Sequence, residues 1–461
     1  MATLRREWPA WARLSDILDL IRLAVPIGVS RSSMMLMGLT DTIVLSRNAP
    51  EELPYILNGW FPLGITMGVS IGLLLGVSIL TAEMSGRGER ADTGRVFRRG
   101  LWTALLFGTV STLVVFFGAQ ALFTLLGFKG ELLSGTASAT QILALGIIGH
   151  LVSHAAGSYL EALRRPAVVT IAMYGGVVFN LVLNLAFVGG LWGFPQLGAD
   201  GVAIATSATR GILTVILLIF VAWFTPGFRS SAPSPKGEGH QQLKLGYGMA
   251  ASGVAEWGSF NFTFIIATWV GLVAGTVYGM IIHTLGFIFM AFLGIGTATS
   301  VRVAEALGRG NIQQAADGGR LGIVTTIGVG ALGSAVMFFG AQHIASIFVH
   351  SDETLREVAL HPLLASMLML TAVVVIFDGL QNVASMASRA MGSVWPPSFI
   401  HMGCYLGLML PLAWLFGLHF ERGLRGVVEG VITASFLAGV LQVIFFEWLV
   451  RHRKEPSVDL E

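Results

Sequence analysis

Three acidic residues lie inside long apolar runs of the sequence, where a charge is costly. Asp41 follows M-M-L-M-G-L-T, Glu256 lies in G-V-A-E-W-G-S-F, and Asp378 lies in V-V-V-I-F-D-G-L-Q. A charged side chain at the centre of a bilayer costs about 2.5 to 3.5 kcal/mol on insertion scales, so each carboxylate is a candidate functional group. A carboxylate in a low-dielectric cavity can hold a proton, a sodium ion or a cationic ligand in turn, which is the chemistry of an exchanger. The alternative is a structural carboxylate whose partner lies in the helix bundle.

Two amides could complete a cation site around the first of these carboxylates. Asn180 and Asn184 lie four residues apart in F-N-L-V-L-N. On a helix this spacing places both side chains on one face. With Asp41 and Thr206, their oxygens could form a cage for a cation. The alternative is that the two amides join neighbouring helices by hydrogen bonds.

The composition requires a membrane around these residues. Hydrophobic residues make up 54% of the chain and charged residues 12%, about half the charged share of a typical soluble domain. Apolar runs such as residues 101–118 and 432–449 approach the roughly 20 residues that a helix needs to cross a bilayer. We therefore expect a multi-pass protein in contact with lipid. The net charge of +2 gives no indication of nucleic acid, and no nucleic-acid partner is expected.

About twelve apolar spans follow one another along the chain, separated by short loops. Arginines gather in alternate loops, and the positive-inside rule then places both termini in the cytoplasm. A bacterial inner membrane is the expected location. The spans begin near residues 17, 55, 97, 132, 167, 200, 244, 277, 318, 357, 396 and 424.

A seven-residue segment, A-E-x-x-G-R-G, occurs twice, at residues 82–88 and again 222 positions later at residues 304–310. Such a repeat predicts a duplicated architecture. Six spans per copy is an even number, so both copies enter the membrane from the same side, and a pseudo-twofold axis along the membrane normal should relate them. We predict an all-α integral membrane protein of about twelve transmembrane helices in two six-helix lobes. The N-terminal lobe spans residues 14–226, a cytoplasmic linker residues 227–243, and the C-terminal lobe residues 244–451.

The order and spacing of several short motifs resemble the multidrug and toxic compound extrusion (MATE) family over nearly the whole chain. These motifs are P-I-G-V-S, G-L-T-D-T-I, the two A-E-x-x-G-R-G loops, L-R-R-P, F-N-L-V-L-N, L-G-A-D-G-V-A-I-A-T, E-W-G-S-F, F-D-G-L-Q and S-R-A-M-G. The resemblance implies twelve helices in two lobes and efflux of organic cations or drugs, coupled to inward sodium ions or protons. It implies a transporter rather than an enzyme, with no cofactor and no metal other than sodium.

Family membership also implies roles for individual residues. The acidic residue of the first span corresponds to Asp41, and the polar residues of the same lobe correspond to Asn180, Asn184 and Thr206. The acidic residues of the second lobe, Glu256 and Asp378, match the NorM-type branch. Two positions depart from the family pattern. Arg31 stands where a neutral polar or apolar residue is expected and His283 where an asparagine is common, and both are candidates to line a cavity.

The sequence leaves other points open. Arg31 and Arg210 lie within spans, and each could pair with an acidic group or extend to the membrane surface. A monomer is expected. The nearest alternative function is a lipid-linked saccharide flippase of the same superfamily, for which more spans or a strongly basic cavity would be expected. An intramembrane hydrolase is a second alternative, but the chain lacks a credible pair of nucleophile and base.

Overall fold

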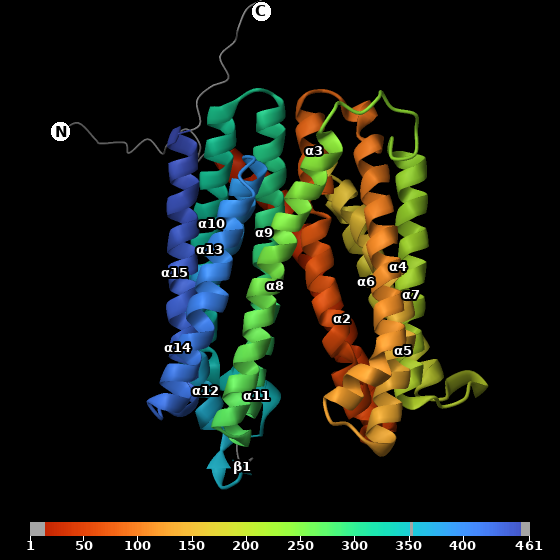
Figure 1. Ribbon diagram of the computed structural model, residues 1–461, viewed down its shortest axis with the longest axis vertical. Coiled ribbons are helices and arrows are strands. Elements are labelled where there is room, and N and C mark those ends of the chain that lie inside the picture. The colour runs from red at the N-terminus through yellow and green to blue at the C-terminus, as the bar shows by residue number, and fades with distance from the viewer. Residues whose placement is uncertain (1–13, 351–353, 453–461) are drawn as a thin grey trace, which may run out of the picture. The chain divides into compact units, whose positions relative to one another are not determined.

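The structure, a computed structural model, describes residues 14–350 and 354–452, and these are almost entirely helical (Figure 1). The predicted cytoplasmic termini lie largely outside the described residues. The helices of the first half are α1 (Leu14–Asn48), α2 (Leu53–Leu73), α3 (Leu75–Gly86), α4 (Gly94–Leu125), α5 (Gly130–Ala162), α6 (Pro166–Phe187) and α7 (Gly198–Phe224). Those of the second half are α8 (Glu238–Val270), α9 (Leu272–Gly308), α10 (Ile312–Phe339), α11 (Ala341–Phe348), α12 (Leu360–Ala390), α13 (Trp395–His401), α14 (Leu410–Trp414) and α15 (Gly423–His452).

Short elements join or interrupt these helices. Three 3-10 helices lie at Pro50–Glu52, Arg90–Asp92 and Leu191–Gly193, and π-helical segments at Met402–Met409 and Leu415–His419 flank α14. The described strands β1 (Thr354–Leu355) and β2 (Val358–Ala359) form one antiparallel hairpin. The two residues between them both have positive φ, at 48° and 67°, as a type I′ hairpin turn requires.

Within the described residues, eleven helical segments are long and apolar enough to cross a membrane. They agree with eleven of the twelve predicted spans, with α2 and α3 forming one span and residues 395–419 another. The twelfth predicted span, which begins near residue 244, corresponds to α8. This helix begins with the polar run E-G-H-Q-Q-L-K and carries Glu256 near its middle, so it is less apolar than the others.

Large apolar side chains cover the outside of these helices. Phe117, Ile171 and Phe339 are each about three-quarters exposed or more, at 75%, 74% and 82%. Exposed apolar surface of this extent would be a liability in water, whereas a bilayer accommodates it. The predicted membrane environment therefore agrees with the helix surfaces as well as with their lengths.

The chain divides into two compact units whose limits differ from those of the predicted lobes. One unit is Val29–Ala250, and the other combines the described parts of Met1–Gly28 and Ala251–Glu461. The first half of α1 therefore packs with the C-terminal half of the chain, and the first part of α8 with the N-terminal half. Hydropathy locates a helix but does not indicate which neighbours each end of a long helix contacts.

The predicted linker of residues 227–243 is also shorter in the structure, because residues 238–243 already belong to α8. Glu238 explains where the helix begins. Its carboxylate accepts from Arg95 Nε at 3.1 Å and from Arg99 Nη2 at 2.5 Å. These ion pairs attach the first turn of α8 to α4, so the irregular segment is limited to residues 225–237.

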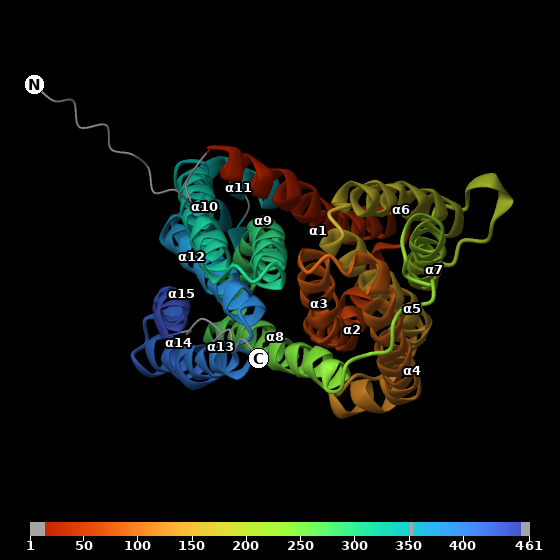
Figure 2. The same cartoon turned by 90° about the horizontal axis from the view of Figure 1, so that it is seen from above.

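Each unit is organised around one central helix, as the view along the helices indicates (Figure 2). In the N-terminal unit, α5 packs against α2, α4 and α7. In the other unit, α12 packs against α9, α10 and α15. The last three turns of α5 are fully buried along their length. Polar side chains at this end must therefore find their hydrogen-bond partners within the unit.

The repeated A-E-x-x-G-R-G segment ends a helix in both units, α3 in one and α9 in the other. In each copy the backbone N–H of the arginine donates to the carbonyl of the glutamate, at 3.0 and 3.1 Å. The final glycine, Gly88 or Gly310, then adopts a left-handed conformation with φ of 81° or 73°. Glycine is favoured there because a Cβ atom is strained at positive φ. The repeated segment is thus a helix-terminating signal that is present in both halves of the chain.

Close packing of α2 against α8 in the N-terminal unit gives a first prediction. A Cβ atom at Gly246 of α8 would overlap the carbonyl oxygen of Leu73. Gly246→Ala should therefore push the two helices apart and lower stability by about 1 to 3 kcal/mol, read as a lower Tm in detergent. Gly258→Ala in the same helix is the control, since a Cβ atom there meets nothing within 4 Å. An unchanged Tm for Gly246→Ala would contradict the close contact.

Candidate cation-binding sites

Asp41 lies at the centre of a buried polar cluster formed by α1, α6 and α7. Its Oδ1 atom accepts from Asn184 Nδ2 at 2.6 Å, and its Oδ2 atom accepts from Thr206 Oγ1 at 2.9 Å. Asn184 Nδ2 also donates to Asn180 Oδ1 at 3.1 Å, and Asn180 Nδ2 donates to Thr206 Oγ1 at 3.4 Å. None of the four residues is more than 1% exposed. The structure therefore brings together all four residues of the predicted N-terminal cluster.

The chemistry of this cluster suits a small cation. It offers two carboxylate oxygens, two amide carbonyls and a hydroxyl, which are oxygen donors of the kind that hard cations prefer. Asn184 Oδ1 has no hydrogen-bond partner, an unusual state for a buried carbonyl. A half-turn of an amide exchanges its oxygen and nitrogen, so Asn180 and Asn184 can present either donors to the bare carboxylate or oxygens to a cation.

A second pair of buried carboxylates lies in the other unit, on α8 and α12. Gln381 Nε2 donates to Glu256 Oε1 at 2.7 Å and to Asp378 Oδ1 at 3.3 Å. Glu256 and Asp378 are 6% and 7% exposed. In the described part of the chain no lysine or arginine forms an ion pair with either of them. Two buried carboxylates that form no ion pair favour a proton or a bound cation, which would offset their charge.

Gln381 was not among the residues predicted for this site. It lies three residues after Asp378 on the same helix, a spacing that places both on one face, and this is the signal in F-D-G-L-Q that could have indicated it. Its Oε1 atom is buried without a hydrogen-bond partner. The bridging amide is therefore a further oxygen donor between the two carboxylates.

Arg31, a predicted cavity residue, forms an internal ion pair in the N-terminal unit. Its Nη2 atom donates to Glu161 Oε2 at 2.9 Å, and its Nη1 atom lies 3.0 Å from His154 Nδ1. The side chain of Glu161 is 1% exposed and that of Arg31 is 11% exposed. The sequence did not indicate Glu161, which lies two residues before the L-R-R-P loop and looks like a residue of the membrane surface.

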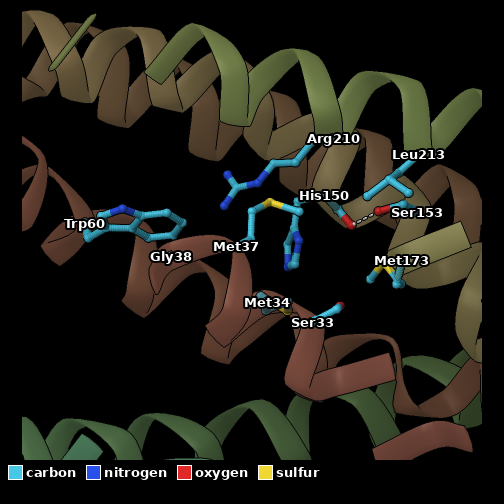
Figure 3. Close-up of a pocket in the computed structure, with 10 residues that line it drawn as sticks. All are labelled: Ser33, Met34, Met37, Gly38, Trp60, His150, Ser153, Met173, Arg210 and Leu213. Carbon is cyan, nitrogen blue, oxygen red and sulfur yellow. Dashed lines mark hydrogen bonds between the residues drawn. The ribbon is translucent and has the colours of Figure 1, made fainter. Parts of the chain in front are cut away.

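A pocket lies in the same unit, lined by α1, α2, α5, α6 and α7 (Figure 3). Arg210 extends into it toward the ring of Trp60, with the guanidinium carbon 5.1 Å from the ring centroid. His150 faces the same space, and methionines form much of the remaining wall. His283, the other predicted cavity residue, does not line this pocket. It lies on α9 with an exposed side chain.

Two segments of the chain, residues 26–186 and 249–415, match the family model described as MatE. The chain belongs to the MatE family. The predicted resemblance is thereby confirmed, and the two matched segments correspond to the two halves of the duplicated sequence. Asp41, Asn180 and Asn184 fall in the first MatE segment, and Glu256 and Asp378 fall in the second.

Individual MatE relatives cover nearly the whole chain. The chain is 32% identical over 452 residues to a probable multidrug resistance protein NorM of Caulobacter vibrioides, covering 96% of this chain and 94% of that protein. It is 24% identical to the multidrug resistance protein PmpM of Pseudomonas aeruginosa, covering 93% and 91%.

Solved structures of MATE transporters have the same fold as this chain. An outward-facing multidrug resistance MATE family transporter superposes with a TM-score of 0.85 at 20% identity, covering 94% of this chain and 96% of that one. A eukaryotic MATE transporter gives a TM-score of 0.83 at 19% identity, covering 95% and 98%. The all-helical MatE fold therefore holds across sequences that share about a fifth of their residues.

The carboxylate pair of this MatE chain gives a second prediction. Glu256→Gln removes one of two buried charges but keeps the shape of the side chain. We expect transport to fall about tenfold, because cation binding loses a charged ligand. Stability should stay equal or rise by about 1 kcal/mol, since replacing a buried charge by a neutral group removes a desolvation cost. Transport and Tm are measured on the same preparation, with Glu421→Gln, an exposed carboxylate, as control. A normal rate of transport would exclude Glu256 from the site.

Proposed function

We propose that this protein is a secondary active multidrug efflux antiporter that exports organic cations in exchange for sodium ions or protons. The observation that carries the proposal is the buried Asp41 cluster, in which a carboxylate is surrounded by amides that can present either donors or oxygens. Relatives named as multidrug resistance proteins over almost the full length support the drug-efflux part. The chain is a transporter in this proposal and not an enzyme.

Exchange requires only that the coupling cation and the substrate bind less well together than apart. Such a penalty acts equally on both affinities, because linkage is reciprocal. A membrane potential contributes about 2.3 kcal/mol per elementary charge per 100 mV, which corresponds to roughly a fifty-fold concentration ratio per net charge moved. The Glu256 and Asp378 pair supplies a second set of sites for the coupling ion or the substrate.

We further propose that the protein works as a monomer in the bacterial inner membrane, with both termini in the cytoplasm. The arginine-rich loops support this orientation, because loops rich in arginine and lysine tend to lie in the cytoplasm. The lipid-linked saccharide flippase is not favoured, because both candidate clusters are acidic, whereas a pyrophosphate headgroup requires basic residues. The curated relatives also carry multidrug resistance names.

The decisive experiment uses the full-length protein in proteoliposomes with a fluorescent organic cation, ethidium, as substrate. A sodium gradient and a proton gradient are imposed separately, and each is then collapsed with a sodium or proton ionophore. Uphill movement of ethidium that depends on one gradient supports the antiporter and identifies the coupling ion. If neither gradient moves ethidium, and the protein gives no drug resistance to an efflux-deficient bacterial host, the proposal is wrong.

A further inference from the structure

Arg389 is an arginine that is completely buried on α12 and forms no ion pair within the described residues. It belongs to the motif S-R-A-M-G and is 0% exposed. Three hydroxyl groups hold its guanidinium: Nη1 donates to Ser385 Oγ at 2.7 Å, and Nη2 donates to Ser252 Oγ at 2.6 Å and to Ser398 Oγ at 3.2 Å. Hydroxyl groups accept these hydrogen bonds but carry no charge. A buried charge that is only hydrogen-bonded remains costly unless an opposite charge lies near it.

Glu256, one of the two carboxylates of the second candidate site, supplies an opposite charge. Ser252 and Glu256 lie four residues apart on α8, so their side chains share one face, about 6 Å apart along the helix axis. Arg389 and Glu256 attract each other electrostatically, although they are not in ion-pair contact. Glu256 Oε1 instead accepts from Gln381 Nε2 at 2.7 Å. Arg389 therefore places a positive charge beside the carboxylate pair without being a ligand of either carboxylate.

The charges of these three buried side chains do not cancel. Glu256 and Asp378 contribute two negative charges when both are ionised, and Arg389 contributes one positive charge, which leaves a net charge of −1. The side chains are 6%, 7% and 0% exposed, so water and salt screen this remaining charge poorly. One monovalent cation or one proton would make the group neutral. A second cation, or one divalent cation, would leave an uncompensated positive charge inside the membrane, which is costly.

We propose that Arg389 is a specificity-determining residue of the Glu256 and Asp378 site, a fixed counter-charge that limits the site to one monovalent cation or one proton. Without it, two carboxylates and the Gln381 amide would be a set of oxygen ligands whose charge suits a divalent cation. With it, the site binds a single positive charge less tightly, because Arg389 repels any cation there. Weaker binding suits an exchanger, which must release the cation on the other side of the membrane. This inference rests on the proposed function and specifies the charge of the ion that the site takes.

A purely structural role would also account for the hydrogen bonds of Arg389, two of which join α12 to α8 and to α13. The two roles predict different results when the charge is removed. Loss of a structural arginine from the core lowers stability and leaves cation binding equal or weaker. Loss of a counter-charge raises the cation affinity of the site, whatever happens to stability. The cation affinity therefore separates the two roles.

The test measures cation binding to the full-length protein in detergent, in an Asp41→Asn background that removes the charged ligand of the N-terminal cluster. The probes are radioactive Na⁺ and Ca²⁺, each added alone, in equilibrium dialysis. Infrared absorption of buried protonated carboxyl groups, measured without sodium, counts bound protons and so distinguishes a proton site from a sodium site. The variants are Arg389→Met, Arg389→Lys and Ser252→Ala, and Glu256→Gln identifies the signal of this site. Arg425→Met, whose side chain is 67% exposed, is the control.

We expect Arg389→Met to raise the Na⁺ affinity roughly 10- to 50-fold, as Coulomb's law gives for a charge about 7 to 12 Å away at an effective dielectric constant of about 20. It should also allow Ca²⁺ to bind. If the site takes protons, the absorption of protonated carboxyl groups should double, from one group to two. Arg389→Lys keeps the charge and should stay close to the wild type. Ser252→Ala should weaken cation binding a few-fold, because Nη2 loses an acceptor and the guanidinium is left to Glu256, and this variant tests the proposal if Arg389→Met does not fold.

The inference is overturned if Arg389→Met changes neither the Na⁺ affinity nor the number of protonated carboxyl groups, or if the site with Arg389 in place already binds Ca²⁺. A lower Tm without a gain in cation binding would likewise make Arg389 a structural residue only. The ethidium assay distinguishes these failures from failure of the proposed function. Gradient-driven ethidium transport by the wild type, with cation binding unchanged in Arg389→Met, would contradict only the counter-charge. A gain in cation binding without gradient-driven transport by the wild type would contradict only the antiporter.

Discussion

Asp41→Asn is expected to reduce the transport of organic cations strongly while leaving the protein folded. The substitution keeps the size of the side chain but removes the charge at the centre of the N-terminal cluster. It also places an NH2 group opposite Asn184 Nδ2 or Thr206 Oγ1, which now donate to the two carboxylate oxygens at 2.6 and 2.9 Å. A bound cation loses its charged ligand, so its affinity and the transport that depends on it should fall roughly 10- to 150-fold.

The measurement is ethidium efflux from an efflux-deficient bacterial host, with the amount of protein in the membrane determined in parallel. Asp200→Asn is the matched control. Asp200 lies in the same unit, in the first turn of α7, and its carboxylate accepts from Ser138 of α5, outside the cluster. Thr206→Ser keeps the hydroxyl and should retain transport. Full activity of Asp41→Asn at normal expression would remove the N-terminal cluster from the mechanism.

Most of the N-terminal cluster could be predicted because its members are recognisable one by one. An aspartate in an apolar run is rare, and two asparagines four residues apart share a helix face whatever the tertiary packing. The segments that carry them also belong to a family pattern that fixes which helices meet. The approximate bounds of the spans could also be predicted, because hydropathy depends only on residues that are close in the sequence.

The missed features depend on how helices are rotated and packed, which hydropathy does not encode. Glu161 is 130 residues from Arg31, and only the packing of α1 against α5 brings the two side chains together. The division of α1 after Gly28 between two compact units leaves no signal in a continuous apolar run. Arg210 was recognised as a charge within a span, but only the structure shows that its Nη1 atom is buried without a hydrogen-bond partner among the described residues.

Glu161→Ala should destabilise the protein more than loss of any exposed ion pair. The substitution leaves the Arg31 guanidinium, 11% exposed, without its carboxylate. Breaking a buried pair by removing one partner typically costs about 3 to 5 kcal/mol, because the remaining charge is uncompensated. The Tm in detergent should fall by on the order of 10 °C. The corresponding break in the half-exposed pair Arg320 and Glu447, at 27% and 30%, should cost less than about 1 kcal/mol.

Removing both charges separates a structural role of this pair from a functional one. In Arg31→Met with Glu161→Leu no charge is left uncompensated, and such replacements are often neutral or stabilising. We therefore expect the double variant to regain most of the Tm lost by Glu161→Ala, which a double-mutant cycle measures as coupling between the two sites. Ethidium efflux should return with stability if the pair only holds α1 against α5. A double variant that is stable but inactive would instead show that the charges themselves act in the transport cycle. A double variant as unstable as Glu161→Ala would contradict our explanation that the uncompensated Arg31 charge causes the loss of stability.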